Sequence, residues 1–379
     1  MGQPLTLGPR VVAWMESRLV FGLGAMAGQP LRLRRDQKRT IFEAYEINPD
    51  GTRKWNRLTL GRARGWGKTE LVAAIGNAEL AGPVVFNGFD EQGRPKAKPQ
   101  INPEVVVIAA SFEQAGILFS AATNQLRGVD SPGPLAHQFE FLDKEIRFVD
   151  GHPGSLRRVY TSAASLDGKN VSALLADEVH EFTPGNRKDS FVKLRRGLIK
   201  RSGAWCFAIS TAGERGGGSV AEDEYLLQKR IAAKEIEVPG VKIDWVEAAK
   251  GDLNNPKILK AAIEMANPWA DAKQREMLAA EYHDPTTTHH AFCRYHLNQW
   301  IRGSADNWLA ENPGSWSRCY APDLRLIDRA PAVMGLDLSM KSDTTAAVIA
   351  QEVDGRIVVR CKVWFPTAAT PIDYNDVID

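Results

Sequence analysis

Cysteine is scarce in this sequence of 379 residues, and the few cysteines are far apart. They are Cys206, Cys293, Cys319 and Cys361, and no two of them form a CxxC pair. Zinc ribbons need paired cysteines, and small disulfide-rich domains need a denser set of them. Both classes of protein are therefore excluded, and we expect the chain to fold in a reducing compartment.

Long hydrophobic runs are also lacking. The most apolar early stretch, residues 11–28, is interrupted by Glu16 and Arg18, and no small-residue cleavage site follows it. A membrane span needs about 20 mostly apolar residues, and a secretory signal ends in a cleavage site. We expect neither, and we interpret the stretch as an amphipathic helix.

A surplus of one charge is missing as well. The chain has 48 basic and 46 acidic residues, which gives a formal net charge of +2. Attraction of the whole chain to nucleic acid is therefore weak, and any nucleic-acid site must be local. With 44% hydrophobic residues the chain is an ordinary globular protein rather than a disordered one.

The length favours two domains, because one core rarely organises this many residues. Apolar runs occur at residues 57–61, 105–110, 173–176 and 205–210. Continuous rather than alternating apolar residues are typical of parallel strands that helices cover on both faces. The sequence predicts an α/β fold with a mostly parallel sheet, and it predicts an exposed excursion at the Gly- and Pro-containing residues 82–103.

The pattern changes near residue 240. Residues 247–265 and 270–282 are helix-prone and predict a helical connector. Three apolar segments follow, with Asp354 and Gly355 as the second turn, at residues 332–338, 344–351 and 357–365. These segments predict an antiparallel meander.

A glycine-bearing loop follows the first apolar run. It reads Arg62-Ala63-Arg64-Gly65-Trp66-Gly67-Lys68-Thr69 and is followed by a helix-prone segment. In phosphate-binding loops, backbone amides cradle the phosphates, the lysine neutralises their charge, and the threonine helps to hold Mg²⁺. Arg62 replaces the first glycine of the usual GxxxxGK[ST] pattern, so this loop taken alone is compatible with a nucleotide site and with a chance match.

Two later strands end in residues that would complete such a site. Asp177 and Glu178 follow an apolar strand, where Asp177 would order the hydration shell of the metal and Glu178 would polarise the attacking water. Thr211 directly follows the run at residues 205–210, at a position where a sensor of the γ-phosphate is expected. The alternatives are a solvated acidic turn and a plain strand-to-turn pair, and the loop upstream favours the catalytic interpretation.

In this order the motifs resemble those of the large terminase subunits of tailed phages. The matching segments lie at residues 63–71, 165–170, 176–181, 210–213, 266–268, 296–300 and 335–339. The resemblance spans roughly residues 10–365, and the combination is more specific than any single motif. It implies a phosphate-loop ATPase domain, a helical linker and an RNase H-like nuclease domain. The expected bounds are residues 1–30 for a helical lead-in, 31–240 for the ATPase domain, 241–330 for the linker and 331–379 for the nuclease domain.

The resemblance also implies roles for single residues. Arg64 would be the loop arginine that stabilises phosphoryl charge, and Gln37 would read the adenine edge with its amide donor and acceptor. A surface glutamine is an equal alternative for Gln37, and His180 is expected to be a packed or surface histidine. The expected ATP ligands are Gln37, Arg64, Gly65, Gly67, Lys68, Thr69, Asp177 and Thr211, with Mg²⁺ on Thr69 and Asp177. Arginines that could act on a neighbouring subunit are Arg195, Arg196 and Arg201.

Asp337 stands in the middle of an apolar segment. Burying a carboxylate there is costly unless a metal ion or hydrogen bonds compensate. The resemblance makes this segment the first strand of the nuclease, with Asp337 as a catalytic acid that binds Mg²⁺ or Mn²⁺. Asp343 is either an accessory acid or a turn residue, and the acids of the tail, Asp373, Asp376 and Asp379, are not assigned. Because the family's remaining metal-binding acids do not fit after Phe365, we expect the nuclease domain to be incomplete.

The expected partners follow from the resemblance alone. They are double-stranded DNA, a portal protein, a small terminase subunit and further copies of the chain in a ring, in the host cytoplasm. Two other interpretations stay open. One is a superfamily 2 type helicase or other DNA-dependent ATPase, against which the Asp337 segment counts, and the other is a non-catalytic nucleotide-binding scaffold.

Overall fold

The computed structural model describes residues 4–160, 170–301, 315–339, 344–366, 372 and 377. Residues 165–169 of the matching motif, Asp343, and the tail acids Asp373, Asp376 and Asp379 lie outside the described residues. The chain divides into two compact units, Met1–Ser304 and Ala305–Asp379.

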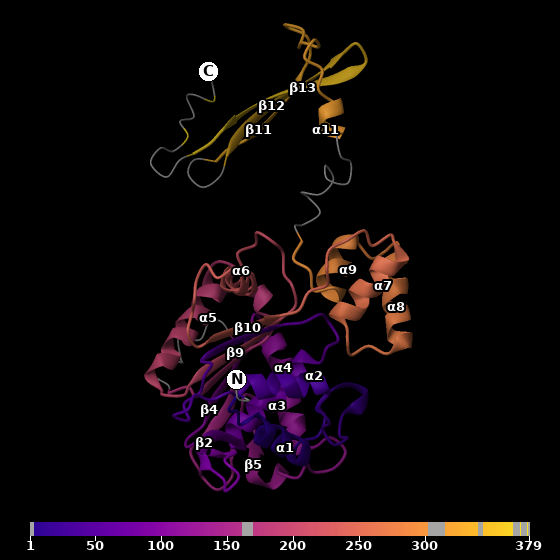
Figure 1. The fold of residues 1–379 in the computed structure, drawn as a ribbon. Coiled ribbons are helices and arrows are strands. Elements are labelled where there is room, and N and C mark those ends of the chain that lie inside the picture. Colours follow the sequence, from indigo (N-terminus) through magenta and orange to yellow (C-terminus); the bar gives the residue numbers. More distant parts are fainter. Residues whose placement is uncertain are drawn as a thin grey trace. The chain divides into compact units, whose positions relative to one another are not determined.

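A sheet of eight strands organises the first unit (Figure 1). In spatial order its strands are β10 (Val241–Trp245), β1 (Arg57–Gly61), β9 (Trp205–Ser210), β8 (Ala173–Ala176), β4 (Glu104–Ala109), β7 (Ser155–Tyr160), β6 (Glu145–Phe148) and β5 (Phe139–Phe141). The strands from β10 to β7 pair in parallel, and β6 and β5 extend the sheet by antiparallel pairing. The predicted mostly parallel sheet is confirmed.

Alternate side chains of the central strands enter two separate cores. In β4, Val105 and Val107 belong to one core, and Val106 and Ile108 belong to the other. Burying a valine or leucine side chain is worth about 1.5–3 kcal/mol, so a strand that is apolar on both sides needs helices on both faces. The helices on the first face are α1 (Gly8–Arg18), α2 (Arg35–Ala44), α3 (Lys68–Ala81) and α4 (Phe112–Arg127), and those on the second are α5 (Asn186–Gly197) and α6 (Val220–Ala232).

Helix α3 is buried on nearly every side, with eleven of its 14 residues buried. Two of its buried polar side chains form hydrogen bonds with other elements. Asn77 donates to the Ala122 carbonyl at 3.0 Å, and Glu79 accepts hydrogen bonds from Tyr45 at 2.8 Å and Arg53 at 3.0 Å. Moving the helix would leave these groups unpaired in a low-dielectric interior, so its N-terminus is held firmly in place.

Three elements of the first unit differ from the sequence-based expectations. The helix expected over residues 11–28 ends at Arg18, because Gly24 and Gly28 adopt φ values of +71° and +84° in a loop that a bridge between Val20 and Pro30 closes. The excursion at residues 82–103 contains a hairpin of β2 (Pro83–Phe89) and β3 (Pro95–Pro99). Strand β10 was missed, because its partly buried residues sit at the edge of the sheet.

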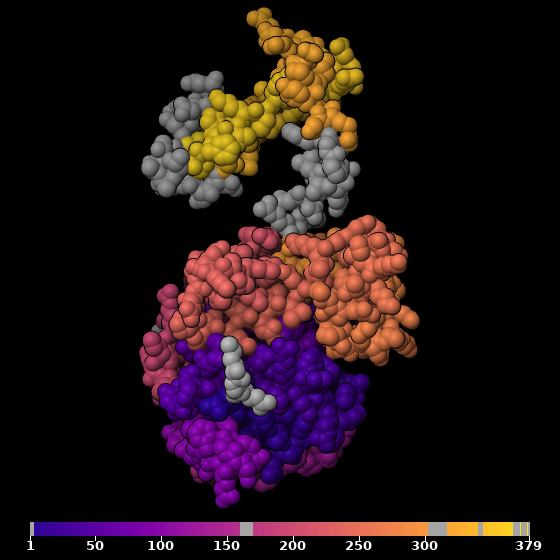
Figure 2. All heavy atoms as spheres, viewed as in Figure 1, coloured from indigo at the N-terminus to yellow at the C-terminus, as the bar shows by residue number. Residues whose placement is uncertain are grey.

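Three helices form a lobe of the first unit, drawn in orange in Figure 2. They are α7 (Pro256–Ala266), α8 (Ala272–His283) and α9 (His289–His296). The helix expected from residue 247 begins at Pro256, because the Asn255 side chain accepts from the Lys257 amide at 3.0 Å and proline suits the first helical turn. The lobe core includes Leu259, Phe292 and also Ala63 of the phosphate loop.

None of the helices in the described part of the chain is both long and apolar enough to cross a membrane.

The second unit contains the predicted antiparallel meander. Its strands are β11 (Val333–Asp337), β12 (Thr345–Val353) and β13 (Arg356–Trp364), in that spatial order. The turn at Asp354 and Gly355 has φ of 50° and 70°, as a two-residue hairpin turn requires. The buried setting expected for Asp337 is wrong: all five residues of β11 are exposed, and within the described residues this edge strand pairs only with β12.

The close approach of β1 and β10 at Gly61 gives a test of the fold. A Cβ atom on Gly61 would lie 2.1 Å from the Trp245 ring. We expect Gly61→Ala to lower the free energy of unfolding by about 1–3 kcal/mol, because the indole cannot move without disturbing its core. Gly197→Ala is the matched control, since nothing lies within 4 Å of the position of its new methyl group. Equal denaturant midpoints for the two variants would contradict this packing.

Candidate nucleotide site

The phosphate loop leaves the carboxyl end of β1 and enters α3. Gly65 and Gly67 both have φ of +86°, a conformation that favours glycine. A Cβ atom on Gly65 would also lie 2.7 Å from the Trp269 ring. Gly67 caps α3 without a side-chain hydrogen bond, so the first amides of the helix and its positive dipole end are left for an anionic ligand.

Arg62 stands where the usual phosphate-loop pattern has its first glycine, and its side chain has a structural role. Its guanidinium donates to the carbonyls of Gly61 at 2.9 Å and Asp244 at 2.7 Å. It also forms an ion pair with the Asp244 carboxylate. Arg62 therefore ties the loop to β10, and its side chain is buried in that structural role.

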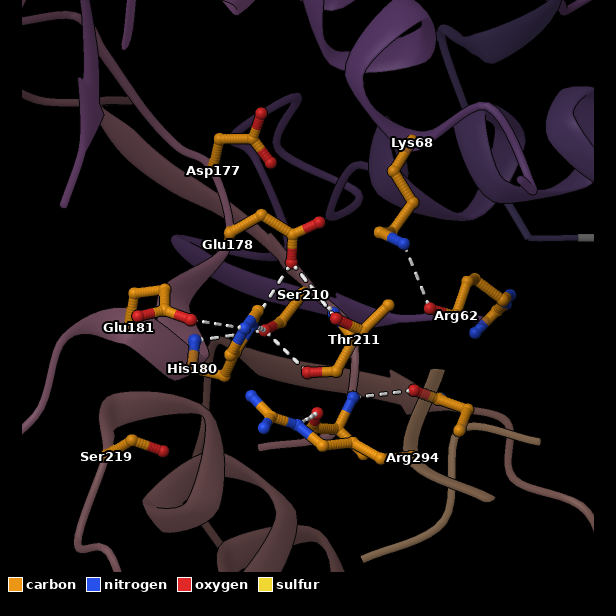
Figure 3. Close-up of polar contacts among 12 residues, drawn as sticks. Arg62, Lys68, Asp177, Glu178, His180, Glu181, Ser210, Thr211, Ser219 and Arg294 are labelled. Atoms are coloured by element: carbon orange, nitrogen blue, oxygen red, sulfur yellow. Dashed lines mark hydrogen bonds and ion pairs between the residues drawn. The ribbon is translucent and has the colours of Figure 1, made fainter. Parts of the chain in front are cut away.

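Lys68 lies at the first position of α3 with its amine buried inside the loop (Figure 3). Its Nζ donates to the carbonyls of Arg62 at 3.0 Å and Ala63 at 3.2 Å. Burial lowers the pKa of this amine, and the nearby carboxylates of Glu178 and Asp177 oppose that shift. An ammonium has three donors, so one remains for a phosphate oxygen.

Asp177 lies at the tip of β8 and faces the start of α3. Thr69 Oγ1 donates to Asp177 Oδ2 at 3.3 Å. The other oxygen, Oδ1, is buried and has no hydrogen-bond partner among the described residues. Burial and the charge of Glu178 raise the pKa of Asp177 to about 7. A buried carboxylate oxygen without a partner, next to a hydroxyl oxygen, fits a divalent cation with oxygen ligands.

Glu178 has a left-handed backbone conformation, with φ of 47°. This conformation costs free energy in a residue other than glycine and is concentrated at functional sites. Oε2 accepts from the Thr211 amide at 3.1 Å and from the Thr211 hydroxyl at 3.3 Å, and it lies 3.1 Å from His180 Nδ1. Burial would raise the pKa of Glu178, but the hydrogen bond with His180 and the charge of Lys68 lower it to about 2.

Gln37 also belongs to this region. It is buried in the first turn of α2, and its Oε1 accepts from the Arg34 amide at 3.1 Å. Its Nε2 would lie only 3.2 Å from a Cβ atom on Gly67, so the amide lies against the loop. The alternative of a surface glutamine is wrong, while adenine recognition stays a prediction.

Arg64 is exposed at the edge of the loop and is held by α9. Its amide donates to the Tyr295 carbonyl at 2.8 Å, and its guanidinium lies 3.9 Å from the centroid of the Tyr295 ring. Its expected action on phosphoryl charge stays a prediction.

Sequence reasoning missed the residues through which α9 and the segment after it reach the end of β9. Arg294 Nε donates to the Ala212 carbonyl at 2.8 Å, and Asn298 Oδ1 accepts from the Ala212 amide at 2.8 Å. His180 was missed as a member of the site too. The available signal was position: Asn298 falls in the matching segment 296–300, and His180 directly follows the acidic pair.

The remaining candidates lie elsewhere. Arg195 pairs with Glu224 at 3.1 Å, and Glu224 also pairs with Arg57 at the amino end of β1, opposite to the phosphate loop. Arg201 donates to three backbone carbonyls, whereas Arg196 has no ion pair among the residues that the structure describes. Asp337 belongs to the second unit, and no group of three His, Cys, Asp or Glu side chains among the described residues could hold a metal ion.

Two family models match the chain. Residues 94–230 match the model described as terminase large subunit, ATPase domain, and residues 255–374 match terminase large subunit, endonuclease domain. Together the two segments make up more than half of the chain. The phosphate loop precedes the first segment, so its assignment depends on its own motif and geometry.

Similar proteins come from phages. The Gene 13 protein of Mycobacterium phage D29 is 26% identical over 371 residues, which cover 87% of this chain and 60% of that protein. The terminase, large subunit, of Enterobacteria phage HK97 is 26% identical over 354 residues, which cover 92% of this chain and 63% of that protein. The chain thus spans about 60% of the length of these relatives. The crystal structure of the HK97 bacteriophage large terminase has a similar fold, with a TM-score of 0.59 at 23% identity, covering 96% of this chain and 69% of that one.

The raised pKa of Asp177 predicts a specific dependence of stability on pH. The folded pKa is about 7 and the ordinary value is 3.8, so between these values the folded chain binds a proton that the unfolded chain has lost. This group therefore lowers the free energy of unfolding as the pH rises from about 4 to about 7. Asn has no such proton to lose. We expect the stability of Asp177→Asn relative to the parent to rise over this range, measured by denaturant unfolding without nucleotide or metal. A difference that stays constant with pH would contradict the burial of an unpaired Asp177.

Proposed function

The chain belongs to the terminase large subunit family, and from that premise we propose that it hydrolyses ATP to move double-stranded DNA into a phage procapsid. The observation that carries this proposal is the convergence of Lys68, Asp177 and Glu178 at the uncapped N-terminus of α3. An anion-binding helix end, a buried cation ligand and an ionised carboxylate together match what phosphoryl transfer to water requires.

The phosphates of ATP would occupy the N-terminus of α3. Its free amides would donate to phosphate oxygens, and the remaining N–H of Lys68 would neutralise their charge. Arg64 would approach from the edge of the loop by leaving or adjusting its stack on Tyr295. Gln37, whose Nε2 lies against Gly67, would contact the base.

Thr69 and Asp177 would hold Mg²⁺, which when bound supplies positive charge that neutralises the phosphates. The unpartnered Oδ1 of Asp177 and the hydroxyl of Thr69 are the oxygens that fit this ion. The buried position of Asp177 is consistent with this role, because a cation would compensate the cost of burying a carboxylate.

Glu178 would orient the attacking water and accept its proton. Thr211 and His180 both contact Oε2 of Glu178. Neither of them contacts Oε1 in the described structure. Because its pKa is lowered, Glu178 is ionised at neutral pH and acts as an acceptor. Thr211 would report the state of the γ-phosphate to the end of β9.

The rest of the proposal follows from the family. The segment 255–374, which matches the endonuclease model, includes Asp337, and we propose this residue as a ligand of Mg²⁺ or Mn²⁺. The exposed Asp337 is not part of an acidic cluster within the described residues, and no nuclease step is assigned to it. The proposed partners are DNA, portal protein, small terminase subunit and neighbouring copies in a ring, in the host cytoplasm.

Two substitutions test the ATPase proposal. Lys68→Ala should abolish hydrolysis and weaken ATP binding, because it removes the charge that faces the phosphates. Glu178→Gln should keep ATP binding but lower kcat by about 100-fold or more, since an amide is a far weaker proton acceptor. Phosphate release and binding of a fluorescent ATP analogue measure the two effects, with and without double-stranded DNA.

Lys96→Ala and Glu91→Gln are the matched controls for Lys68→Ala and Glu178→Gln. Both residues are exposed and lie in the region of the β2–β3 hairpin, outside the phosphate loop. Near-normal turnover by Lys68→Ala or Glu178→Gln would remove the ATPase assignment. A parent chain that binds ATP but releases no phosphate, with or without DNA, would favour the non-catalytic scaffold.

A further inference from the structure

The imidazole of His180 connects three parts of the nucleotide site (Figure 3). His180 follows β8 in the short helix η4 (Val179–Glu181), and its side chain is only 8% exposed. Nδ1 lies 3.1 Å from Glu178 Oε2 and 3.1 Å from Ser210 Oγ, and Nε2 lies 2.9 Å from Glu181 Oε1. The ring thus contacts Glu178 after β8, the last residue of β9 and the last residue of η4.

The hydrogen-bond partners determine what the ring can do. The Ser210 hydroxyl donates its one hydrogen to the Thr211 carbonyl at 2.8 Å and accepts from the His180 amide at 3.0 Å. It can therefore only accept from Nδ1. The ionised carboxylates of Glu178 and Glu181 also only accept. Both ring nitrogens consequently donate, and the ring is an imidazolium between two carboxylates. Although burial lowers the pKa of His180, these contacts outweigh burial and raise it.

The consequence for Glu178 is that one of its oxygens is fully occupied. Oε2 accepts hydrogen bonds from the Thr211 amide, the Thr211 hydroxyl and the His180 ring. The other oxygen points away from His180, on the side where Lys68 lies (Figure 3). Thr211 alone would leave the carboxylate free to rotate about its last bond. A charge-assisted donor on the opposite side from Thr211 removes that freedom.

We propose that His180 is a positioning residue for ATP hydrolysis, which clamps Oε2 of Glu178 through Nδ1 and so leaves the other carboxylate oxygen for the attacking water. Glu181 holds the ring from its Nε2 side and keeps the plane of the ring aligned with Glu178. This inference rests on the proposed role of Glu178, and it adds a residue that acts through Glu178 rather than on the nucleotide.

Two isosteric variants separate the two sides of the ring. In His180→Asn the amide nitrogen takes the place of Nδ1 and can still donate to Glu178. In His180→Gln the amide nitrogen takes the place of Nε2 and can still donate to Glu181, but the contact with Glu178 is lost. We expect His180→Gln to lower kcat by about 10–100-fold, as the loss of one charge-assisted hydrogen bond implies, with KM for ATP nearly unchanged. His180→Asn should keep most of the turnover.

Glu181→Gln serves as the control for the outer contact, and it should lower kcat only a few-fold. A merely structural role for His180 predicts a different pattern, in which Asn and Gln lower the free energy of unfolding and kcat together and raise KM. Denaturant unfolding and binding of the fluorescent ATP analogue are therefore measured for every variant. Parent-like turnover by His180→Gln, or an equal loss of kcat in both His180 variants, would overturn the proposal.

A measurement without hydrolysis tests the clamp itself. With histidine labelled with ¹⁵N, the signals of His180, identified by their absence in His180→Asn, should show both ring nitrogens protonated at neutral pH in the parent. Glu178→Gln should shift the Nδ1 signal far more than the Nε2 signal. A neutral ring in the parent, or an unchanged Nδ1 signal in Glu178→Gln, would overturn the clamp. A parent that hydrolyses no ATP would instead overturn the proposed function, whatever these signals show.

Discussion

The parallel pairing of β8, β9 and β1 is the constraint on which the site depends. Parallel strands end at the same edge of a sheet, so the tips of these three neighbours must meet there. The phosphate loop, the Asp177–Glu178 pair and Thr211 each follow one of these tips. Two cores hold the pairing in place, because the strands are apolar on both faces and neither face can be uncovered cheaply. Shifting one strand by one residue would exchange the side chains of the two cores and separate the site.

The site buries several charged groups close together, and hydrogen bonds within the described part of the protein do not compensate all of them. One buried lysine faces two adjacent carboxylates, and the two respond in opposite directions. Glu178 accepts from several donors and stays ionised. Among the described residues, one oxygen of Asp177 has no hydrogen-bond partner, and the pKa of this carboxyl is raised to about 7. This asymmetry is consistent with the two roles that we propose, in which Glu178 acts as a proton acceptor and Asp177 as a ligand of a cation. A cation that bound only to the folded chain at Asp177 would raise the free energy of unfolding.

The lobe of α7–α9 completes the site from outside the sheet. Tyr295 contacts Arg64 of the phosphate loop, and its neighbour Arg294 donates to the carbonyl of Ala212 next to Thr211. Ala63 of the phosphate loop is also buried in the core of the lobe. The lobe therefore packs both against the phosphate loop and against the segment after β9, and α9 contacts both of them.

Local sequence predicted the parallel strands, the phosphate loop and the residues that follow the strand ends, for physical reasons. Continuous apolar runs predict buried parallel strands, Gly65 and Gly67 satisfy backbone angles that other residues avoid, and Asp177, Glu178 and Thr211 follow strands whose ends must converge. The meander of the second unit was readable from its apolar segments and its Asp354–Gly355 turn. Only the tertiary structure decided how α1 ends, that β10 joins the sheet edge, that Gln37 lies against Gly67, that Arg62 turns to Asp244, and that His180 lies between Glu178 and Glu181. Each of these depends on contacts between side chains of separate elements, or on a local conformation that packing selects. The spacing of residues along the chain does not determine which of several polar groups will accept a hydrogen bond from a buried donor.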